Sequence, residues 1–449
     1  MINAFKAYDI RGEYGKDFDK EIVYKIGFFL PKLLQTDKIL VGRDIRLSSQ
    51  EIFLALTQGI TDAGCDVYDL GLATTPMVYY FTAQHHFKAS VQITASHNPK
   101  NHNGLKISKT NAEPVGYNTG LKDLEHWVEN EPIITTGKKG KIEQYNCMSE
   151  YEQFLLSYKP DFDNLKIVVD CSNGMACLLV DKILGAKPHY INKRMDGNFP
   201  GHEPNPLEME NIVQLQTAVQ HSHADIGVIF DGDADRVMFV DENAQFISPD
   251  LMIALLGHYF YEKKNLSGKV LFDIRTSRDV KEYLIQLGGE PHMWKVGRAY
   301  AALKLKEIDG LFGGELAGHY YFKDFFYSDS AMLAVILMLN IMADFKRKNI
   351  SVSQAIAKIK KYENSGELNF KVQNKTKIME MLKDYFCEQE SCLHLYDFDG
   401  YRIEFADWWF NIRPSNTEPY LRFIAEAKTK DLLNEKIHIV EQTITDNAQ

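Results

Sequence analysis

The chain has 449 residues, of which 45% are hydrophobic and 25% are charged, a composition typical of soluble globular proteins. At about 150 residues per domain, this length predicts roughly three domains. The formal net charge of −10 argues against a general nucleic-acid binder, although local groups of Arg and Lys can still attract a small anionic substrate.

The termini and the apolar segments give no sign of secretion or of membrane insertion. The N-terminus, MINAFKAYDIRG, lacks the apolar region of a signal peptide. The longest apolar stretch, residues 331–343, is shorter than the ~20 residues of a membrane span and predicts a buried helix. Six scattered cysteines without a Cys-x-x-Cys pair indicate reduced thiols. We therefore expect a cytoplasmic monomer or homodimer that binds neither membranes nor nucleic acid.

Most of the chain alternates short β-rich runs with helix-like segments. Alternation of this kind predicts parallel or mixed sheets, in which ligands bind beyond the carboxyl ends of the strands. Several of the polar loops follow such β-rich runs. Strands are expected at residues 38–44, 165–170, 224–231 and 269–273, and helices at 49–63, 207–220 and 277–287.

The C-terminal part of the chain has a different pattern. Three strand-like runs at 401–405, 408–413 and 421–426 are separated by short turns, and a segment rich in Leu, Glu and Lys follows them. This order predicts a small α+β domain with an antiparallel sheet. Polar stretches near 136–141, 241–248 and 362–366, the first and last of which contain glycine, are the predicted domain boundaries.

A serine stands in the first polar loop, TASHNPKNHNG at residues 94–104, directly after the apolar run 90–93. The loop is compatible with a surface turn, with a hydrolase nucleophile or with another use of the hydroxyl. No Gly-x-Ser-x-Gly elbow supports the hydrolase interpretation. The sequence of this loop alone does not establish the role of Ser96, and the other loops have to be considered.

Three carboxylates at alternate positions mark the second loop, DGDADR at residues 231–236. They suit a hard divalent cation with oxygen ligands, and without a cation they would repel each other. An EF-hand needs glycine at its sixth position, where this chain has Arg236, even though Glu242 falls at the twelfth. Haloacid-dehalogenase phosphatases also place Asp after a strand, but that interpretation leaves Asp235 and Ser96 unexplained. A solvated acidic turn is the simplest alternative.

Two later loops carry residues suited to sugar and phosphate binding. In LFGGELAGH, residues 311–319, the paired glycines allow a ligand to approach closely, and Glu315 can accept hydrogen bonds from sugar hydroxyls. The segment NIRPSNTEPYLR, residues 411–422, offers guanidinium, hydroxyl and amide donors that suit a phosphate dianion. Taken alone, either loop could be an ordinary turn. YDIRG at residues 8–12 is the weakest of these motifs.

Taken together, the motifs resemble the α-D-phosphohexomutase superfamily, whose four signatures occur here in the family's order. They are TASHNP at 94–99, DGDADR at 231–236, GELAGH at 314–319 and RPSNTEP at 413–419. FKAYDIRG near the start and HEPNPLEMENI at 202–212 are most similar to the phosphomannomutase/phosphoglucomutase group. The resemblance covers nearly the whole chain.

The resemblance implies an α/β fold of three similar domains with mixed sheets, plus a smaller C-terminal α+β domain, around a central active-site cleft. It implies interconversion of hexose 6-phosphate and hexose 1-phosphate, of mannose and/or glucose, through a phosphoserine enzyme and a 1,6-bisphosphate intermediate. A haloacid-dehalogenase-type sugar phosphatase with Asp231 as nucleophile, or a non-catalytic sugar-phosphate-binding relative, are the alternatives. The expected domains are 1–145 with the phosphoserine loop, 146–247 with the metal loop, 248–362 with the sugar loop and 363–449 with the phosphate loop.

The family's functional residues transfer to matching positions of this chain. One Mg²⁺ per site would be held by Ser96, Asp231, Asp233 and Asp235, with a hexose 1,6-bisphosphate as activator. Lys106 would act as general acid/base if Arg11 and the metal lower its pKa from about 10.4. The implied catalytic residues are Ser96, His97, Lys106, Arg11 and Arg236. The implied substrate-binding residues are Tyr8, Arg275, Arg298, Glu315, Ala317, His319, Arg413, Ser415, Asn416, Thr417 and Arg422.

Three positions depart from the family's usual residues. Ala317 stands where serine is frequent, and the loss of one hydrogen bond, about 0.5–1.5 kcal/mol, should leave activity intact. Arg298 replaces a histidine that many mannose and glucose mutases carry, which puts sugar selectivity in question. Arg275 replaces lysine, which keeps the charge and changes its reach.

Overall fold

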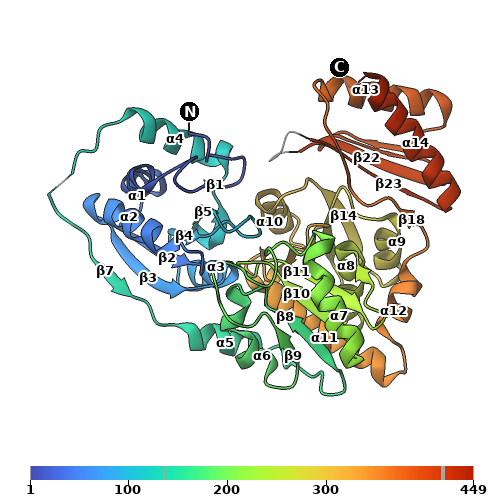
Figure 1. Cartoon of the computed structure of the whole chain (residues 1–449), viewed down its shortest axis with the longest axis horizontal. Helices are drawn as coiled ribbons and strands as arrows, with labels where there is room; N and C mark the ends of the chain where they lie inside the picture. Colours follow the sequence, from blue (N-terminus) through green and yellow to red (C-terminus); the bar gives the residue numbers. More distant parts are fainter. Residues whose placement is uncertain (1, 136, 416–419, 448–449) are drawn as a thin grey trace.

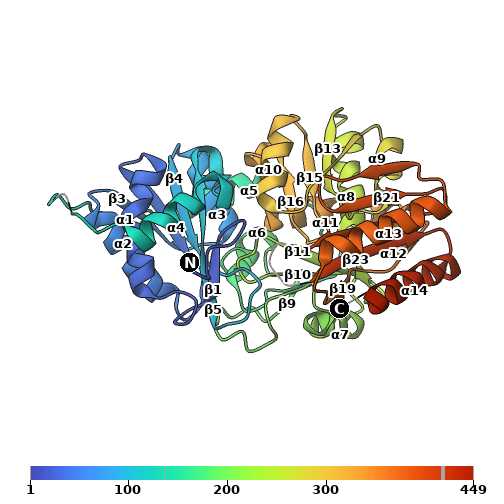
Figure 2. The ribbon, with the colours of Figure 1, turned by 90° about the horizontal axis from the view of Figure 1, so that it is seen from above.

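The computed structural model describes residues 2–135, 137–415 and 420–447, and it contains four sheets that follow one another along the chain (Figure 1). Figure 2 shows the first sheet and its helices at one end of the molecule, and the third and fourth sheets with their helices at the other. Within these described residues, no helix is both long and apolar enough to cross a membrane.

The first sheet is mixed and carries helices on both faces. Its strands run in the order β1-β5-β4-β2-β3-β7, and β6 pairs with β5. Strands β4, β2, β3 and β7 are parallel, whereas β5 is antiparallel to β4 and to β1. The strands are β1 (Ile10–Glu13), β2 (Lys38–Arg43), β3 (Asp66–Leu72), β4 (Ala89–Ile93), β5 (His102–Lys109), β6 (Glu113–Pro114) and β7 (Ile142–Gln144). The helices are α1 (Lys20–Leu34), α2 (Ser49–Asp62), α3 (Thr75–Gln84) and α4 (Leu121–Asn130).

The second and third sheets repeat one pattern, in which three parallel strands are followed by two antiparallel ones. Their orders are β12-β11-β10-β8-β9 and β14-β13-β15-β16-β17. The second contains β8 (Ile167–Asp170), β9 (His189–Ile191), β10 (Ile226–Phe230), β11 (Val237–Asp241) and β12 (Phe246–Ile247), with α5 (Met148–Leu156), α6 (Val180–Leu184) and α7 (Val213–Ser222). The third contains β13 (Lys269–Asp273), β14 (Glu290–Trp294), β15 (Phe312–Gly314), β16 (Tyr320–Phe322) and β17 (Ser328–Asp329), with α8 (Pro249–Gly257), α9 (Arg278–Gln286), α10 (Arg298–Glu307), α11 (Ala331–Arg347) and α12 (Val352–Ile359).

Helix α11 confirms the buried helix expected at residues 331–343, since every residue of that stretch is buried. It belongs to the largest apolar cluster, which also contains Met77 and Phe81 of α3, Phe230 of β10 and Phe312 of β15. A common core therefore holds the first three sheets together, and it fixes the loops at their strand ends relative to one another.

The fourth sheet is antiparallel, as expected, and has a hydrophobic core of its own. Trp408 and Phe405 stack with ring centroids 4.8 Å apart, and Phe386 of the covering helix packs edge-on against Trp408. The elements are β18 (Glu363–Asn364), β19 (Leu368–Phe370), β20 (His394–Tyr396), β21 (Tyr401–Glu404), β22 (Trp408–Pro414), β23 (Leu421–Ala427), α13 (Lys375–Gln389) and α14 (Lys430–Asn447).

One predicted helix is wrong at its start. The α-helix expected at 207–220 begins only at Val213, after a 3-10 turn at Met209–Ile212. The Asn205 side chain accepts a hydrogen bond from the Leu207 backbone N–H at 3.3 Å, and this local turn competes with helix formation.

Candidate active site

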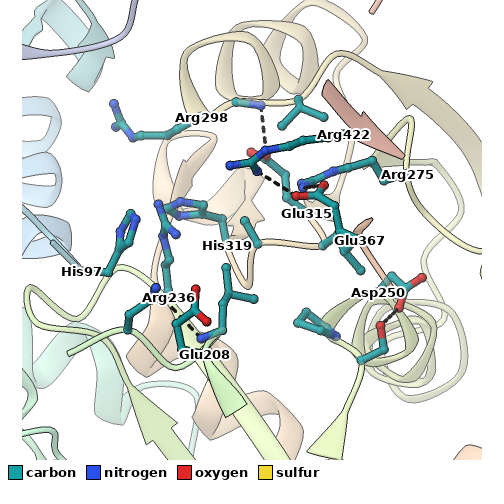
Figure 3. A pocket seen from close by; sticks show the side chains of 18 of the residues that line it. His97, Glu208, Arg236, Asp250, Arg275, Arg298, Glu315, His319, Glu367 and Arg422 are labelled. Carbon is teal, nitrogen blue, oxygen red and sulfur yellow. Dashed lines mark hydrogen bonds and ion pairs between the residues drawn. The ribbon is translucent and has the colours of Figure 1, made fainter. Parts of the chain in front are cut away.

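Loops from all four sheets meet around one cavity of about 1650 Å³. The predicted site residues that line it come from each part of the chain, and Figure 3 shows several of them pointing into the same space. Ser96, Asp231 and Asp233 are fully buried next to this lining. The lining includes Tyr8, Arg11, His97, Lys106, Asp235, Arg236, Arg275, Arg298, Glu315, Ala317, His319, Arg413, Ser415 and Arg422.

The serine loop joins β4 to β5 and aims the Ser96 hydroxyl at the acidic loop. Ser96 Oγ donates a hydrogen bond to Asp231 Oδ2 at 2.8 Å, and His97 Nδ1 lies 3.3 Å from the same Oγ. The backbone of Ser96 is left-handed, with a φ of 52°, which costs a non-glycine residue about 1–3 kcal/mol unless its surroundings hold it. The loop is therefore held in a strained conformation that presents this hydroxyl.

Arg46, which the sequence analysis missed, supplies that support. Its buried guanidinium donates to four backbone carbonyls of the serine loop: Ser96 at 2.9 Å, Asn98 at 2.6 Å, Pro99 at 2.7 Å and His102 at 3.1 Å. The sequence offered one signal for this contact, an arginine just beyond β2. Because β2 runs parallel to β4, the two strands end at the same edge of the sheet, and a side chain beyond β2 can reach the loop that follows β4. His102, which has no assigned role, contributes its carbonyl to this bonding.

Replacing Arg46 with lysine is expected to lower kcat by about tenfold to a hundredfold, since small misplacements of a reacting group have effects of that size. One ammonium cannot reach four carbonyls arranged around a planar guanidinium. We expect the KM for sugar phosphate to stay within about twofold, because the other end of the cavity is untouched.

The matched control is Arg43→Lys, because Arg43 is the last residue of β2, three positions before Arg46, and pairs with Asp69 at 2.7 Å instead of with the loop. Steady-state kinetics and thermal melting of both variants separate positioning from stability. Equal losses of kcat in the two variants would contradict the positioning role of Arg46.

The acidic loop, residues 231–236, brings three fully buried carboxylates together. Ligand oxygens of Asp231, Asp233 and Asp235 all lie within 4.8 Å of one another. Gly232 lets this loop approach the serine loop, because a Cβ there would lie 2.5 Å from the Ser96 carbonyl oxygen. Among the described residues, Asp233 Oδ1 and Asp235 Oδ1 are buried without a hydrogen-bond partner. Unpartnered anionic oxygens beside a serine hydroxyl fit a hard divalent cation.

The surroundings of the acidic loop exclude two other interpretations, a solvated acidic turn and an EF-hand. The loop is neither solvated nor an EF-hand, since all three carboxylates are buried and Arg236 leads directly into β11. Glu242, the twelfth position of such a hand, accepts a hydrogen bond from the Ser353 N–H at 3.0 Å instead.

Lys106 lies on β5, and its ammonium contacts the acidic loop directly. Its Nζ lies 2.6 Å from Asp233 Oδ2 and 2.5 Å from Asp235 Oδ2. Burial alone lowers the pKa of Lys106, but attraction by Asp233 and Asp235 outweighs burial and raises this pKa above its ordinary value. The carboxylates lie nearer to Lys106 than Arg11 does, so their effect on the pKa of Lys106 exceeds that of Arg11, and a lowered pKa with a metal in the acidic loop stays a prediction.

Cations surround His97 at this end of the cavity. Burial, followed by the charges of Arg236 and Arg11, holds the pKa of His97 well below its ordinary value. Arg236 Nε lies 3.9 Å from both Asp231 and Asp235, and Arg11 donates to the Asn98 side chain at 2.9 Å. His97 is therefore a neutral imidazole beside the serine hydroxyl.

The middle of the cavity is built by the third domain. Glu315 accepts hydrogen bonds from the Gly297 N–H at 2.9 Å and the Tyr321 hydroxyl at 2.5 Å, and each oxygen keeps a lone pair for a ligand. Tyr8 crosses from the first domain and donates to the Val296 carbonyl at 3.4 Å. Ala317 lies half-buried in the lining.

One buried carboxylate, Asp329, joins two of the predicted residues and was also missed. It contacts His319 Nδ1 at 2.6 Å and Arg298 Nε at 2.9 Å. The Arg298 guanidinium also stacks 3.6 Å from the centroid of the Tyr79 ring. Arg298, the main departure from the family pattern, is thus held in place on two sides.

At the other end, three arginines from the third and fourth domains gather around Glu367, and Figure 3 labels two of them, Arg275 and Arg422. Arg275, Arg413 and Arg422 approach its carboxylate at 3.2, 3.5 and 2.8 Å. Ser415 lies in the same lining, whereas Asn416 and Thr417 lie outside the residues that the structure describes. The site therefore has an acidic end with a serine, and an arginine-rich end.

Comparison with known proteins identifies the family. Four domain models described as phosphoglucomutase/phosphomannomutase match in chain order: α/β/α domain I at residues 3–131, domain II at 149–244, domain III at 248–362 and the C-terminal domain at 367–441. The chain belongs to the phosphoglucomutase/phosphomannomutase family. It is therefore an enzyme, a phosphohexomutase of carbohydrate metabolism.

Individual relatives agree with this family. A phosphomannomutase of Escherichia coli is 35% identical over an alignment 448 residues long, which covers 96% of this chain and 97% of the relative. The crystal structure of a phosphoglucomutase/phosphomannomutase family protein from Burkholderia thailandensis superposes with a TM-score of 0.87 at 28% identity, over 100% and 98% of the two chains. N-acetylphosphoglucosamine mutase of Aspergillus fumigatus, solved with GlcNAc-6P and magnesium, shares the fold with a TM-score of 0.65 at 13% identity, over 100% and 96%.

Proposed function

We propose that this phosphohexomutase interconverts the 6-phosphates and 1-phosphates of mannose and/or glucose through a phosphorylated Ser96 and a hexose 1,6-bisphosphate. One observation carries the proposal. A buried serine hydroxyl at the acidic end and three arginines at the other end face the same cavity. Such a cavity suits a sugar with a phosphate at each end.

The arginine-rich end would hold the phosphate that does not react, since guanidinium groups bind phosphate by paired, charge-assisted hydrogen bonds. The sugar hydroxyl at the opposite end then faces phosphorylated Ser96. Transfer breaks the bond from phosphorus to Ser96 Oγ and forms a bond from phosphorus to the sugar oxygen. Arg11 and Arg236 would stabilise the charge on the transferring group, as phosphoryl transfer depends mainly on positioning and charge.

Lys106 is assigned to the proton transfers. Its ammonium would first protonate Ser96 Oγ as that oxygen leaves. Neutral His97, beside the same oxygen, would accept the proton that the attacking sugar hydroxyl loses. In the return step these proton transfers run in reverse, and Ser96 recovers a phosphoryl group from the other end of the sugar.

The acidic loop fits the metal that this chemistry needs, since its buried oxygens include two without a hydrogen-bond partner among the described residues. Asp231, Asp233, Asp235 and Ser96 would hold one Mg²⁺. When bound, the ion would offset negative charge on the transferring phosphoryl group.

The bisphosphate must turn around between the two transfers without leaving. The cavity of about 1650 Å³ exceeds the roughly 300–1000 Å³ of ordinary small-molecule sites. It therefore has room for the bisphosphate to reorient. A hexose 1,6-bisphosphate in solution would also act as activator by phosphorylating Ser96.

The phosphatase alternative requires Asp231 to attack phosphate. Its Oδ2 accepts from the Ser96 hydroxyl, and its Oδ1 accepts from the backbone N–H groups of Asp235 and Arg236, each at 3.2 Å. A carboxyl with these partners is a poor nucleophile, which favours Ser96.

Turnover of mannose 1-phosphate, glucose 1-phosphate and glucosamine 1-phosphate, with magnesium and glucose 1,6-bisphosphate supplied, tests the proposal. We expect the mannose and glucose compounds to be isomerised and the glucosamine compound to be used poorly. Steady release of inorganic phosphate without an isomerised sugar would support the phosphatase instead. Binding without turnover would indicate a non-catalytic relative.

Arg298→His tests whether this position sets sugar selectivity. Histidine cannot keep both the ion pair with Asp329 and the stacking on Tyr79. We expect the ratio of kcat/KM between mannose and glucose 1-phosphates to change by about three- to tenfold, the size of a single-group discrimination. Equal losses for the two sugars would show that Arg298 attracts anions without telling the sugars apart.

A further inference from the structure

We propose that Glu367 acts as an internal anion that limits how tightly the arginine-rich end grips a phosphate. This inference rests on the proposed function, in which Arg275, Arg413 and Arg422 hold the phosphate that does not react. Glu367 would be a specificity- and turnover-setting residue that no part of the sequence analysis singled out.

The contacts place a single carboxylate where three guanidinium groups converge. Glu367 Oε2 lies 3.2 Å from Arg275 Nη1 and 3.5 Å from Arg413 Nη2, and Oε1 lies 2.8 Å from Arg422 Nη1. Arg275 and Arg413 are almost completely buried, with side-chain exposures of 6% and 3%. Glu367 comes directly before β19 and lines the cavity itself, so it sits where a ligand anion would sit.

The charges around this point are only partly balanced. Arg275 is also paired with Asp273, at 2.9 Å, so within ion-pair distance three guanidinium groups share two carboxylates, while Asp399 and Glu315 act on Arg413 and Arg275 from farther away. Burial and the like charge of Arg275 lower the pKa of Arg413, and Glu367 opposes this effect. Arg413 Nε is buried without a hydrogen-bond partner among the described residues. This Nε–H donor is available to a phosphate oxygen. The negative charge of Glu367, which lies nearby, would repel that oxygen.

Weak binding at this end has a use in the proposed reaction. The bisphosphate must release one phosphate from the arginines and present the other before the second transfer. Tight binding of substrate and intermediate alike would slow that step without helping the chemistry. A carboxylate that competes for the same guanidinium groups shortens the time for which a phosphate is held.

The opposite interpretation is that Glu367 only aligns the arginines. The two interpretations predict opposite signs for Glu367→Gln, which removes the negative charge and keeps the shape. Loss of a competing anion strengthens phosphate binding, whereas loss of an aligning partner weakens it.

Calorimetric titration of the full chain with inorganic phosphate shows directly whether Glu367→Gln strengthens or weakens phosphate binding. We expect Glu367→Gln to bind phosphate at least about fivefold more tightly than the unmodified protein, given the strength of charge interactions at such distances. Arg413→Gln should abolish the difference, which assigns it to the arginine-rich end. Glu390→Gln is the matched control and should bind as the unmodified protein does. Glu390 accepts a hydrogen bond from Trp408 and pairs with Lys436 in the same domain, outside the cavity lining.

Glu367→Asp gives a second test should the glutamine variant not fold. It keeps the charge but draws it back by one methylene, so its phosphate affinity should fall between those of the unmodified protein and the glutamine variant. In steady-state assays, Glu367→Gln should lower both KM and kcat. Unchanged or weaker phosphate binding in Glu367→Gln, or weaker binding in Glu367→Asp, would overturn the inference. Phosphate binding is read without turnover, so a failure of the proposed function would be seen separately, as absence of isomerised sugar in the unmodified protein.

Discussion

Replacing Ser96 with alanine is expected to lower mutase turnover by about 10⁴-fold or more, the scale seen when the nucleophile of a covalent mechanism is removed. The hydroxyl is the group that the serine loop presents to the acidic loop, at 2.8 Å from Asp231. Because alanine is smaller and apolar, the buried loop should keep its fold. Initial rates with glucose 1-phosphate, magnesium and glucose 1,6-bisphosphate provide the measurement.

Ser108→Ala is the control for this variant. Ser108 is a buried serine on β5, two residues beyond Lys106, and it does not line the cavity. Its replacement should leave turnover within about twofold, as expected of a position away from the reacting groups. Full activity in Ser96→Ala would show that the phosphoserine mechanism is wrong.

Removing the metal, or one of its expected ligands, should have the next largest effect. Chelation of divalent ions should bring turnover to background, and added magnesium should restore it. Asp233→Asn should lower kcat by about 10³-fold, because a bound ion contributes several kcal/mol to charge stabilisation. The variant should also need a higher magnesium concentration for half-maximal rate.

Asp225→Asn serves as the matched control, since Asp225 lies just before β10 and pairs with Lys346 away from the cavity. Its magnesium requirement should equal that of the unmodified protein. A chelated enzyme that keeps full activity, or an unchanged magnesium requirement in Asp233→Asn, would contradict the assignment of the acidic loop.

The features that the sequence predicted well are those encoded locally. The alternation of strands and helices, the buried helix at 331–343 and the antiparallel C-terminal sheet each depend on a nearby pattern of apolar residues, and the structure confirms them. The loops with Ser96, Asp231 and Glu315 follow strands, so their meeting at one cavity follows from the general geometry of α/β sheets.

The features that the sequence missed depend on contacts between distant segments. Arg46 supports a loop 50 residues further on, and Asp329 joins Arg298 to His319 across the third domain. Glu367 stands just after a stretch that resembled a domain boundary, and only the folded chain brings it to three arginines. The contacts of Lys106 with Asp233 and Asp235 were missed for the same reason, since these carboxylates lie more than 120 residues away.

Some expectations stay predictions. These are the domain boundaries, the roles of the individual site residues, the oligomeric state, the cytoplasmic location and the preference between mannose and glucose. The two sugars differ in the orientation of one hydroxyl at C2.

The central claim is that Ser96 carries the phosphoryl group between the two ends of the sugar. The most direct test is to incubate the protein with glucose 1,6-bisphosphate labelled with radioactive phosphate, isolate the protein and map the labelled peptide. We expect the label on Ser96, and we expect unlabelled glucose 1-phosphate to remove it as labelled sugar phosphate. Label on Asp231, or label leaving the protein as inorganic phosphate, would contradict the account.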